Sequence, residues 1–305
     1  MLESLVLDSV AFGDSKLGFE PVLSAFPSLR NLRVQESKDW YYWNGCISST
    51  TLKKLAYRSD GDSSCVPKRC VSFDTPGLVY LDYSDMVADK YENLRLDSLV
   101  EVRLDLRLTA NQIMHKNALD HTEFVPCGVT TLFTGIRNVK ILCLSPDALE
   151  ALYYRSETIP VFNNLITLSL GCNHRPHGSP FIFWKLLPSL LLNSINLETL
   201  IIKGLVHYVR EGWEENCRIL RFSWDNVFDS LSSSAIKVLE INGYRGTCQE
   251  LNQMKCFLGK LSRLEMVKVA YKAVDGDERS RFMKDLLVLP KVSSKCKIQV
   301  VKETA

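Results

Sequence analysis

Three side chains that can ligate a metal lie close together in the stretch Cys172-Asn-His174-Arg-Pro-His177. A thiolate and two imidazoles are donors that suit zinc. Zinc sites usually take a fourth ligand at a defined spacing, often from a second pair, and the sequence offers none nearby. A polar turn is therefore the favoured interpretation, and we predict no metal site.

A second chemical pattern, Gly13-Asp-Ser-Lys-Leu-Gly18, resembles the start of a phosphate-binding loop. Phe19 and Glu20 stand where that loop requires Lys and Ser or Thr, so we reject this interpretation. The stretch from Asp275 to Glu278 is too short for a calcium loop and predicts a turn into a helix. No G-x-S-x-G, H-E-x-x-H, paired Cys-x-x-Cys or kinase-type motif occurs.

We therefore predict that the protein is not an enzyme and has no catalytic residue and no cofactor. The alternative is an enzyme that uses a Cys or His side chain in an inserted loop. A cysteine–histidine pair within hydrogen-bonding reach in a cleft would favour that alternative.

The elements that would position any site follow from the stretch Leu165 to Asn173, which reads L-x-x-L-x-L-x-x-N. This is the signature of a leucine-rich repeat, a short strand followed by a turn into the convex side. Leu168 and Leu170 are two residues apart and share one face of a strand. A neighbouring repeat must cover that face, so further repeats are expected.

The same frame recurs along the chain, with start-to-start spacings from 21 to 40 residues, and six of the nine spacings fall within the usual 20–29. The ten frames are Leu2/Leu5/Leu7, Leu29/Leu32/Val34, Leu52/Leu55/Tyr57, Leu78/Leu81/Tyr83, Leu99/Val102/Leu104, Val139/Leu142/Leu144, Leu165/Leu168/Leu170, Leu197/Leu200/Ile202, Ile236/Leu239/Ile241 and Leu264/Val267/Val269.

The predicted fold is α/β: an irregular leucine-rich-repeat solenoid with a curved parallel sheet and with helices and loops on the convex side. Residues 1–234 form the repeats, and residues 235–305 continue the solenoid and cap it through alternating strands and helices. Helices are predicted at Thr109–Leu119, ending near Gly135, starting after Ser145, and at Gln249–Lys260. Ser145 can accept free backbone amides, and Pro146 and Asp147 suit the first turn.

Composition limits the partners and the compartment. The chain is 46% hydrophobic and 24% charged with a net charge of +2, so charge predicts no broad attraction to nucleic acid or to a membrane. The N-terminus lacks the basic region of a signal peptide, and no apolar run reaches the roughly 18 residues of a membrane span. The ten cysteines are irregularly spaced, which favours reduced thiols. We expect an intracellular protein, cytoplasmic or nuclear and not secreted.

On each predicted strand, the residues between the frame positions point outward onto the concave sheet. The central outward column is Val6, Arg33, Ala56, Asp82, Arg103, Cys143, Ser169, Ile201, Glu240 and Lys268. The candidate partner-binding residues in this column and the next are Arg33, Arg58, Asp82, Arg103 and Asp105, because rigid strands suit recognition of an extended partner. The alternative is a solvated sheet face. For Trp40-Tyr-Tyr-Trp43, a loop packed on the solenoid is favoured over an aromatic binding patch.

Three segments carry a family resemblance: Gly135 to Pro146, Ile241-Asn-Gly-Tyr-Arg-Gly246 with Glu250 after it, and Leu289 to Ile298. With the repeats, they make the chain similar to plant F-box proteins that have leucine-rich repeats and a C-terminal FBD segment. The resemblance implies a substrate-recognition subunit of a cullin-type ubiquitin ligase, whose F-box holds the adaptor and whose repeats present a target protein.

The sequence departs from that family because it begins inside a repeat strand, where the family has its F-box. We therefore do not expect this chain to bind the adaptor, and the target protein is unknown. A functionless truncated paralogue is a further alternative.

Overall fold

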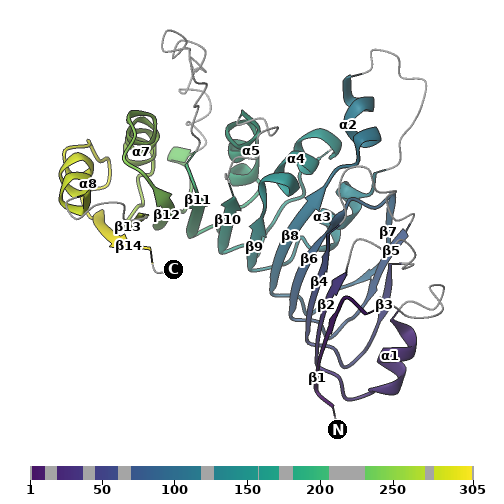
Figure 1. Cartoon of the computed structure of the whole chain (residues 1–305). Helices are drawn as coiled ribbons and strands as arrows, with labels where there is room; N and C mark the ends of the chain where they lie inside the picture. The colour runs from purple at the N-terminus through teal and green to yellow at the C-terminus, as the bar shows by residue number, and fades with distance from the viewer. Residues whose placement is uncertain are drawn as a thin grey trace. The chain divides into compact units, whose positions relative to one another are not determined.

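The computed structural model describes residues 2–10, 19–36, 45–60, 70–117, 127–156, 158–171, 181–205, 231–271 and 278–303. The chain forms two compact units, Met1–Asn164 and Leu165–Ala305. The boundary between these compact units differs from the predicted boundary after residue 234. That prediction separated the repeats from the capping segment by their sequence pattern, and not by compactness. Both units are mixed α/β structures built on parallel strands (Figure 1).

The N-terminal unit has a main parallel sheet in the order β1-β2-β4-β6-β8-β9. Its strands are β1 (Ser4–Asp8), β2 (Asn31–Glu36), β4 (Lys54–Ser59), β6 (Tyr80–Met86), β8 (Glu101–Arg107) and β9 (Ile141–Leu144). The predicted frames are in register, since Leu5 pairs with Leu32, Leu32 with Leu55, and Leu55 with Leu81. Leu81 then pairs with Val102, and Val102 with Leu142.

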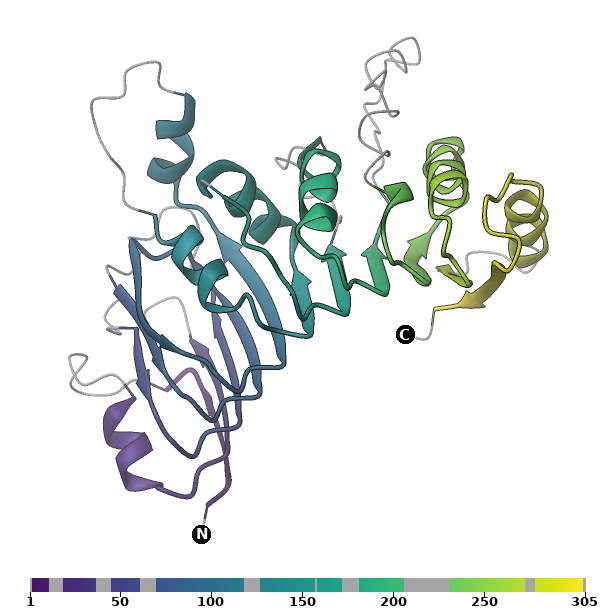
Figure 2. The same ribbon diagram turned by 180° about the vertical axis from the view of Figure 1, so that it is seen from behind.

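A second parallel sheet in this unit was not predicted. It consists of β3 (Cys46–Ser48), β5 (Cys70–Asp74) and β7 (Lys90–Arg95). Phe73 of β5 packs edge-on against Tyr83 of β6, with ring centroids 5.4 Å apart, and Tyr83 stacks on Tyr57 at 5.7 Å. The expectation of only helices and loops behind the main sheet is thus wrong for this part of the chain, where strands occupy that side (Figure 2).

The described residues of the N-terminal unit also form four helices: α1 (Glu20–Ala25), α2 (Ala110–Asn117), α3 (Val129–Gly135) and α4 (Pro146–Arg155). The predicted start of α4 is confirmed, because the Ser145 hydroxyl accepts the backbone amide of Ala148 at 3.0 Å and Asp147 lies in the first turn. Ala148, Leu149, Ala151 and Leu152 are the buried residues of this helix, which packs against β8 and β9.

The C-terminal unit has its own run of parallel strands, in the order β10-β11-β12-β13-β14. The strands are β10 (Thr167–Gly171), β11 (Thr199–Lys203), β12 (Val238–Tyr244), β13 (Met266–Tyr271) and β14 (Lys297–Lys302). Leu168, Leu200, Leu239 and Val267 pair in succession, and Ile298 of β14 follows Val267. The helices α5 (Phe181–Leu192), α7 (Cys248–Lys260) and α8 (Glu278–Leu287) lie on one side of these strands (Figures 1 and 2).

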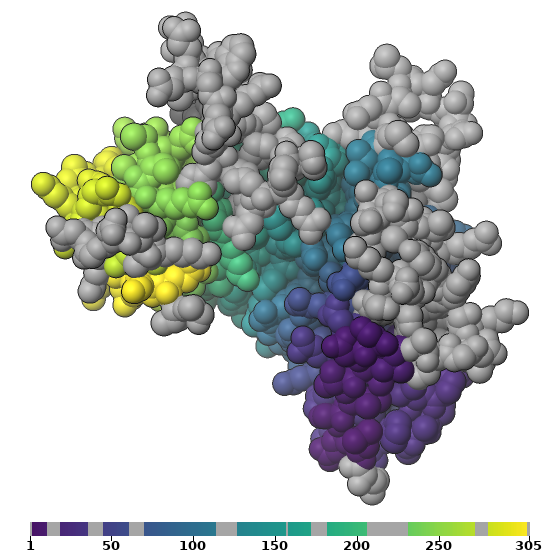
Figure 3. Space-filling model, viewed as in Figure 1, coloured from purple at the N-terminus to yellow at the C-terminus, as the bar shows by residue number. Residues whose placement is uncertain are grey.

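The frame residues form the core of both units. In nine of the ten frames, all three side chains are buried, with exposed fractions of 6% or less. The exception is the first frame: Leu2 is 41% exposed, and Leu5 and Leu7 are only half-buried. β1 pairs with β2 alone in the N-terminal sheet, and its purple segment lies at the surface in Figure 3. A strand with one neighbour buries less of its inward face.

Main-chain hydrogen bonds set the spacing between repeats. A turn precedes the strands: the amides of Leu29, Leu78, Leu99, Val139, Leu197, Leu264 and Cys296 each donate to the carbonyl three residues earlier. Just after this turn, two successive amides donate to one carbonyl of the preceding repeat. The carbonyl of Glu3, for example, accepts the amides of Arg30 and Asn31, and that of Lys237 accepts the amides of Glu265 and Met266. The register therefore does not depend on outward side chains.

The segment after β12 turns sharply into α7. Gly243 and Gly246 have φ values of +72° and +71°, a backbone conformation that residues with a side chain rarely adopt. A Cβ atom on Gly246 would lie only 2.1 Å from Cε1 of Phe282. Thr247 and Glu250 form a capping box on α7. The buried Glu250 carboxylate accepts the backbone amides of Arg245 and Thr247 at 3.0 and 2.9 Å. These contacts explain the Ile241–Gly246 motif and the glutamate that follows it.

Candidate protein-binding face

The outward face of the N-terminal sheet carries the five predicted site residues on neighbouring strands. Arg33 lies on β2, Arg58 on β4, Asp82 on β6, and Arg103 and Asp105 on β8. The three arginines are exposed and the two aspartates are half-buried. Arg33, Ala56, Asp82 and Arg103 occupy one register line across the four strands, as the alternation predicted.

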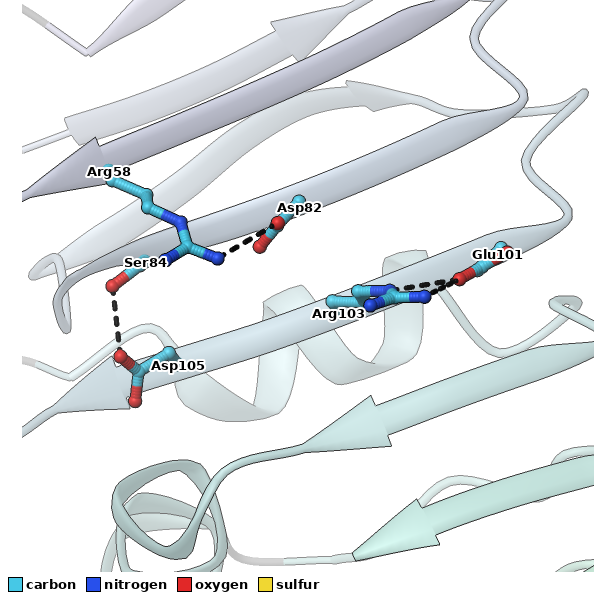
Figure 4. A network of polar contacts seen from close by, with 6 residues as sticks. All are labelled: Arg58, Asp82, Ser84, Glu101, Arg103 and Asp105. Atoms are coloured by element: carbon cyan, nitrogen blue, oxygen red, sulfur yellow. Dashed lines mark hydrogen bonds and ion pairs between the residues drawn. The ribbon is translucent and has the colours of Figure 1, made fainter. Parts of the chain in front are cut away.

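Arg58 and Asp82 form an ion pair between adjacent strands. Nη2 of Arg58 donates to Oδ2 of Asp82 at 3.3 Å, and their side chains are 55% and 17% exposed. Because the pair is partly solvated, it contributes little to folding stability. Its main effect is to hold the guanidinium and the carboxylate in fixed positions on the face (Figure 4).

Arg103 is held within its own strand. Its Nε and Nη2 both approach Oε1 of Glu101 at 2.9 Å, and its guanidinium carbon lies 5.8 Å from the ring centroid of Tyr80. The hydrogen bond with Glu101 raises the pKa of Arg103. Burial raises the pKa of the Tyr80 hydroxyl, and Asp82 raises it further, so this ring is neutral at physiological pH.

Asp105 accepts a hydrogen bond from the hydroxyl of Ser84 at 3.0 Å (Figure 4). Arg33 makes no hydrogen bond or ion pair with the residues that the structure describes. On this face an ion pair joins Arg58 to Asp82, and separate contacts hold Arg103 and Asp105. Arg107 at the end of β8 reaches the backbone oxygen of Ser59 at the end of β4, bridging across β6.

Three contributors to this face were missed: Tyr80, Ser84 and Glu101. Tyr80 and Glu101 begin β6 and β8, two residues before the central column, so the same alternation places them outward. The sequence could have predicted Tyr80 and Glu101, because the first residues of these strands form another outward-facing column. Ser84 lies two residues after Asp82 and so also points outward, but its bond to Asp105 depends on the paired register of β6 and β8.

One prediction about the outward row is wrong. Ser169 of β10 was placed outward and exposed, but it is 3% exposed. It alternates with Leu168 and Leu170, so its direction is as predicted, yet its face of the strand is covered. Ile201, Glu240 and Lys268, which follow it in register, are half-buried or exposed.

The other chemical candidates fall mainly outside the described residues. These are Gly13–Gly18, Trp40–Trp43, Cys172 to His177 and Asp275 to Asp277, and the side chains of all five histidines are likewise not described. Among the described residues, no group of three or more His, Cys, Asp or Glu side chains is arranged to hold a metal. No disulfide bond is assigned to the seven described cysteines.

Three of the described thiols have a raised pKa. Burial raises the pKa of Cys46, Cys70 and Cys296, and Glu92 raises the first two further. A raised pKa reduces the thiolate fraction, and with it the nucleophilicity, at neutral pH. In the part of the chain that the structure covers, no helix is both long enough and apolar enough to span a membrane.

Fold and site together define a class: a mixed α/β protein of parallel strands in register, with a polar outward face and a buried inward one. An F-box protein of Arabidopsis thaliana, At3g59150, is 70% identical over 310 residues, which cover 100% of this chain and 64% of that protein. The Arabidopsis F-box/LRR-repeat proteins At2g42720 and At2g42730 are 40% and 39% identical, over 99% and 98% of this chain. The chain spans 64% and 63% of their lengths.

No protein-family model and no solved structure matches the chain. The similarity to the three relatives nevertheless runs along essentially the whole chain. Arabidopsis F-box and F-box/LRR-repeat proteins are thus close homologues of this chain over its whole length, and the chain spans less than two thirds of theirs.

Proposed function

We propose that this chain is a non-enzymatic protein-binding repeat protein that recognises the target of a cullin-type ubiquitin ligase. The observation that carries the proposal is the outward row from Arg33 to Asp105. Its polar side chains stand on strands whose inward side chains are almost fully buried, so the row is presented on a rigid support. The names of the relatives as F-box proteins support the same role.

We further propose that the ten frames are leucine-rich repeats stacked as a solenoid, with residues 1–234 as the repeats and residues 235–305 as the capping segment. The support is that the central frame residues pair in succession within each unit, and that nine frames are buried. The repeated turn and the shared carbonyl acceptor before successive strands also support one structural unit used many times.

The target that fits the N-terminal row is a protein with an extended, acidic segment. Arg33 offers a guanidinium that has no ion-pair partner among the described residues, and Arg58 and Arg103 offer guanidinium groups that are already oriented. Arginine suits this role because its planar fork binds carboxylates in two-point contacts. Asp82 and Asp105 would then select against acidic groups at the wrong positions. We propose an intracellular site of action, cytoplasmic or nuclear, with a protein partner rather than nucleic acid or membrane.

Affinity purification from a plant extract tests this function. Wild-type chain, an Arg33→Glu/Arg103→Glu variant and an Arg137→Glu/Lys140→Glu control would be compared by quantitative mass spectrometry. Arg137 and Lys140 are exposed and lie just before β9, off the row. We expect a specific set of proteins with wild type and the control, and loss of that set, by about tenfold or more, with the row variant.

Two results would oppose the proposal. Equal recovery by the row variant would remove this face from target binding. Recovery of no partner by well-folded wild type would favour the functionless alternative.

A further inference from the structure

A polar recess of about 370 Å³ lies in the C-terminal unit, where the chain enters β12, β13 and β14. Three cations line it, one from the chain just before each of the three strands: Lys237, Arg263 and Lys295. Ser294 adds a hydroxyl group, whereas the hydroxyls of Ser262 and Ser293 already donate to the backbone oxygens of Ser232 and Leu264. Glu265 is the one carboxylate among the lining residues.

Main-chain contacts hold these segments together. Leu264 donates to the carbonyl of Leu261 at 3.4 Å, and Cys296 donates to that of Ser293 at 3.3 Å, so Arg263 and Lys295 occupy equivalent turn positions. The Ser293 hydroxyl donates to the carbonyl of Leu264 at 2.5 Å, which ties the third segment to the second. The recess is therefore built before any ligand arrives.

The positive charge in the recess is only partly neutralised. Lys237 Nζ donates to Oε1 of Glu198 at 2.7 Å, and this bond raises the pKa of Lys237. The charge of Arg263 acts in the opposite direction on Lys237, so the two cations lie close enough to repel each other. Arg263 and Lys295 form no ion pair with any residue that the structure describes.

The C-terminal unit as a whole also carries an excess of positive charge. Residues 165–305 contain 20 Lys and Arg against 14 Asp and Glu, whereas residues 1–164 contain 17 against 21. An anionic ligand is thus attracted to the C-terminal unit and not to the chain as a whole.

An exposed apolar segment adjoins the recess. Val292, which lines it, is 59% exposed, and Leu287 and Val288 at the end of α8 are 53% and 80% exposed. This C-terminal segment is the yellow part of the surface in Figure 3. A small phosphorylated metabolite would leave these side chains in water, whereas a peptide can cover them.

We propose that this recess binds a phosphorylated side chain of a protein partner, with an apolar residue of the same peptide against Leu287, Val288 and Val292. A phosphate monoester carries close to two negative charges and three acceptor oxygens. These match Arg263 and Lys295, which have no ion-pair partner among the described residues, and the neighbouring hydroxyl of Ser294. This inference rests on the proposed function only in taking the ligand to be a protein. The recess and the N-terminal row are in different units, so each can be tested alone.

The probe is a peptide library with random flanks around one fixed phosphoserine, labelled with fluorescein and measured by anisotropy at low salt. The same library with unmodified serine is the ligand control. We expect the phosphorylated library to bind about tenfold or more tightly than the control library. The Arg263→Gln/Lys295→Gln variant should lose that preference.

The matched variant is Lys255→Gln/Lys284→Gln, which removes the same charge from exposed positions on α7 and α8. It should stay within about twofold of wild type, since only long-range attraction is lost. Circular dichroism on all three proteins would establish equal folding. Capture of targets through the row should be unchanged in the Arg263→Gln/Lys295→Gln variant, which separates this site from the proposed function.

Several results would overturn the inference. One is equal binding of the two libraries, and another is equal loss in both double variants. Inorganic phosphate and inositol hexakisphosphate would be titrated alone: tight binding of the latter without library binding would assign the recess to a small molecule. Preferential binding of a single-stranded oligonucleotide, or of vesicles containing a phosphoinositide, would assign it to those anions instead.

Discussion

The hydroxyl of Tyr83 donates to Oδ2 of Asp85 at 3.1 Å, and both side chains are buried within the N-terminal unit. Tyr244 in the C-terminal unit is also buried, but its hydroxyl has no hydrogen-bond partner among the described residues. The two buried tyrosines thus differ in one respect: the hydroxyl of Tyr83 is hydrogen-bonded, and that of Tyr244 has no partner among the described residues.

Substitution of each tyrosine by phenylalanine should therefore have different effects on the free energy of unfolding. Tyr83→Phe should lower the free energy of unfolding by about 1–3 kcal/mol, because a buried carboxylate loses a donor. Tyr244→Phe should change it by less than about 0.5 kcal/mol or increase it slightly, because an unpaired buried hydroxyl is removed. Urea denaturation of both variants measures this difference, and equal losses would contradict the assigned hydrogen bonding.

Alkaline pH should unfold the protein through its buried tyrosines. Burial raises the pKa of Tyr83, Tyr91 and Tyr244, and Asp85 raises that of Tyr83 further. Because the folded-state pKa is above the unfolded value of about 10, the stabilisation is complete below pH 10 and is lost as pH rises above it. Each such tyrosine should contribute a slope of about 1.4 kcal/mol per pH unit.

The control for this prediction is Tyr83→Phe, whose unfolding free energy should fall less steeply above pH 10. Urea denaturation in steps from about pH 9 to pH 11.5 measures the slopes. Parallel curves for wild type and variant would show that Tyr83 ionises equally in both states.

The frame residues should dominate stability. Leu168→Ala should cost roughly 2–5 kcal/mol, because Leu168 is fully buried between neighbouring strands and a cavity would remain. Lys268→Ala on β13 is the outward control and should stay within about 0.5 kcal/mol. Ser169 does not serve as that control, since it is only 3% exposed. Equal losses in chemical denaturation would contradict the assignment of faces.

The acidic residue of the capping box should also matter. Glu250→Ala should lower the free energy of unfolding by about 1–3 kcal/mol, because the amides of Arg245 and Thr247 lose their acceptor. Glu265→Ala, an exposed glutamate before β13, should change it by less than about 0.5 kcal/mol. A neutral result for Glu250→Ala in thermal and urea unfolding would mean that water replaces the carboxylate.

Much of the strand arrangement was predictable because alternation and register follow from local sequence. The pairing of Leu32 with Leu55 and of Leu200 with Leu239 is the pairing of consecutive frames. The second sheet was missed because β3 has three residues, and only packing against Tyr83 and its neighbours shows that Phe73 belongs to a strand. Short strands of this kind depend on tertiary contacts more than on propensity.

The candidate site was predictable in its directions but not in its contacts. Alternation placed Arg58 and Asp82 outward, but their ion pair depends on the relative register of β4 and β6. Alternation also gave the direction of Ser169 correctly and its exposure wrongly, since burial depends on what covers a face. The proposed roles of Arg33, Arg58, Asp82, Arg103 and Asp105 remain predictions.

The shared carbonyl acceptors between repeats have an evolutionary consequence. Where one peptide oxygen receives two amides from the next repeat, the chain maintains its geometry with atoms that every residue type except proline supplies. Substitutions on the outward strand positions are then free to accumulate without disturbing the scaffold. A gene duplicate could therefore change the chemistry of its outward face by a few surface exchanges and still fold.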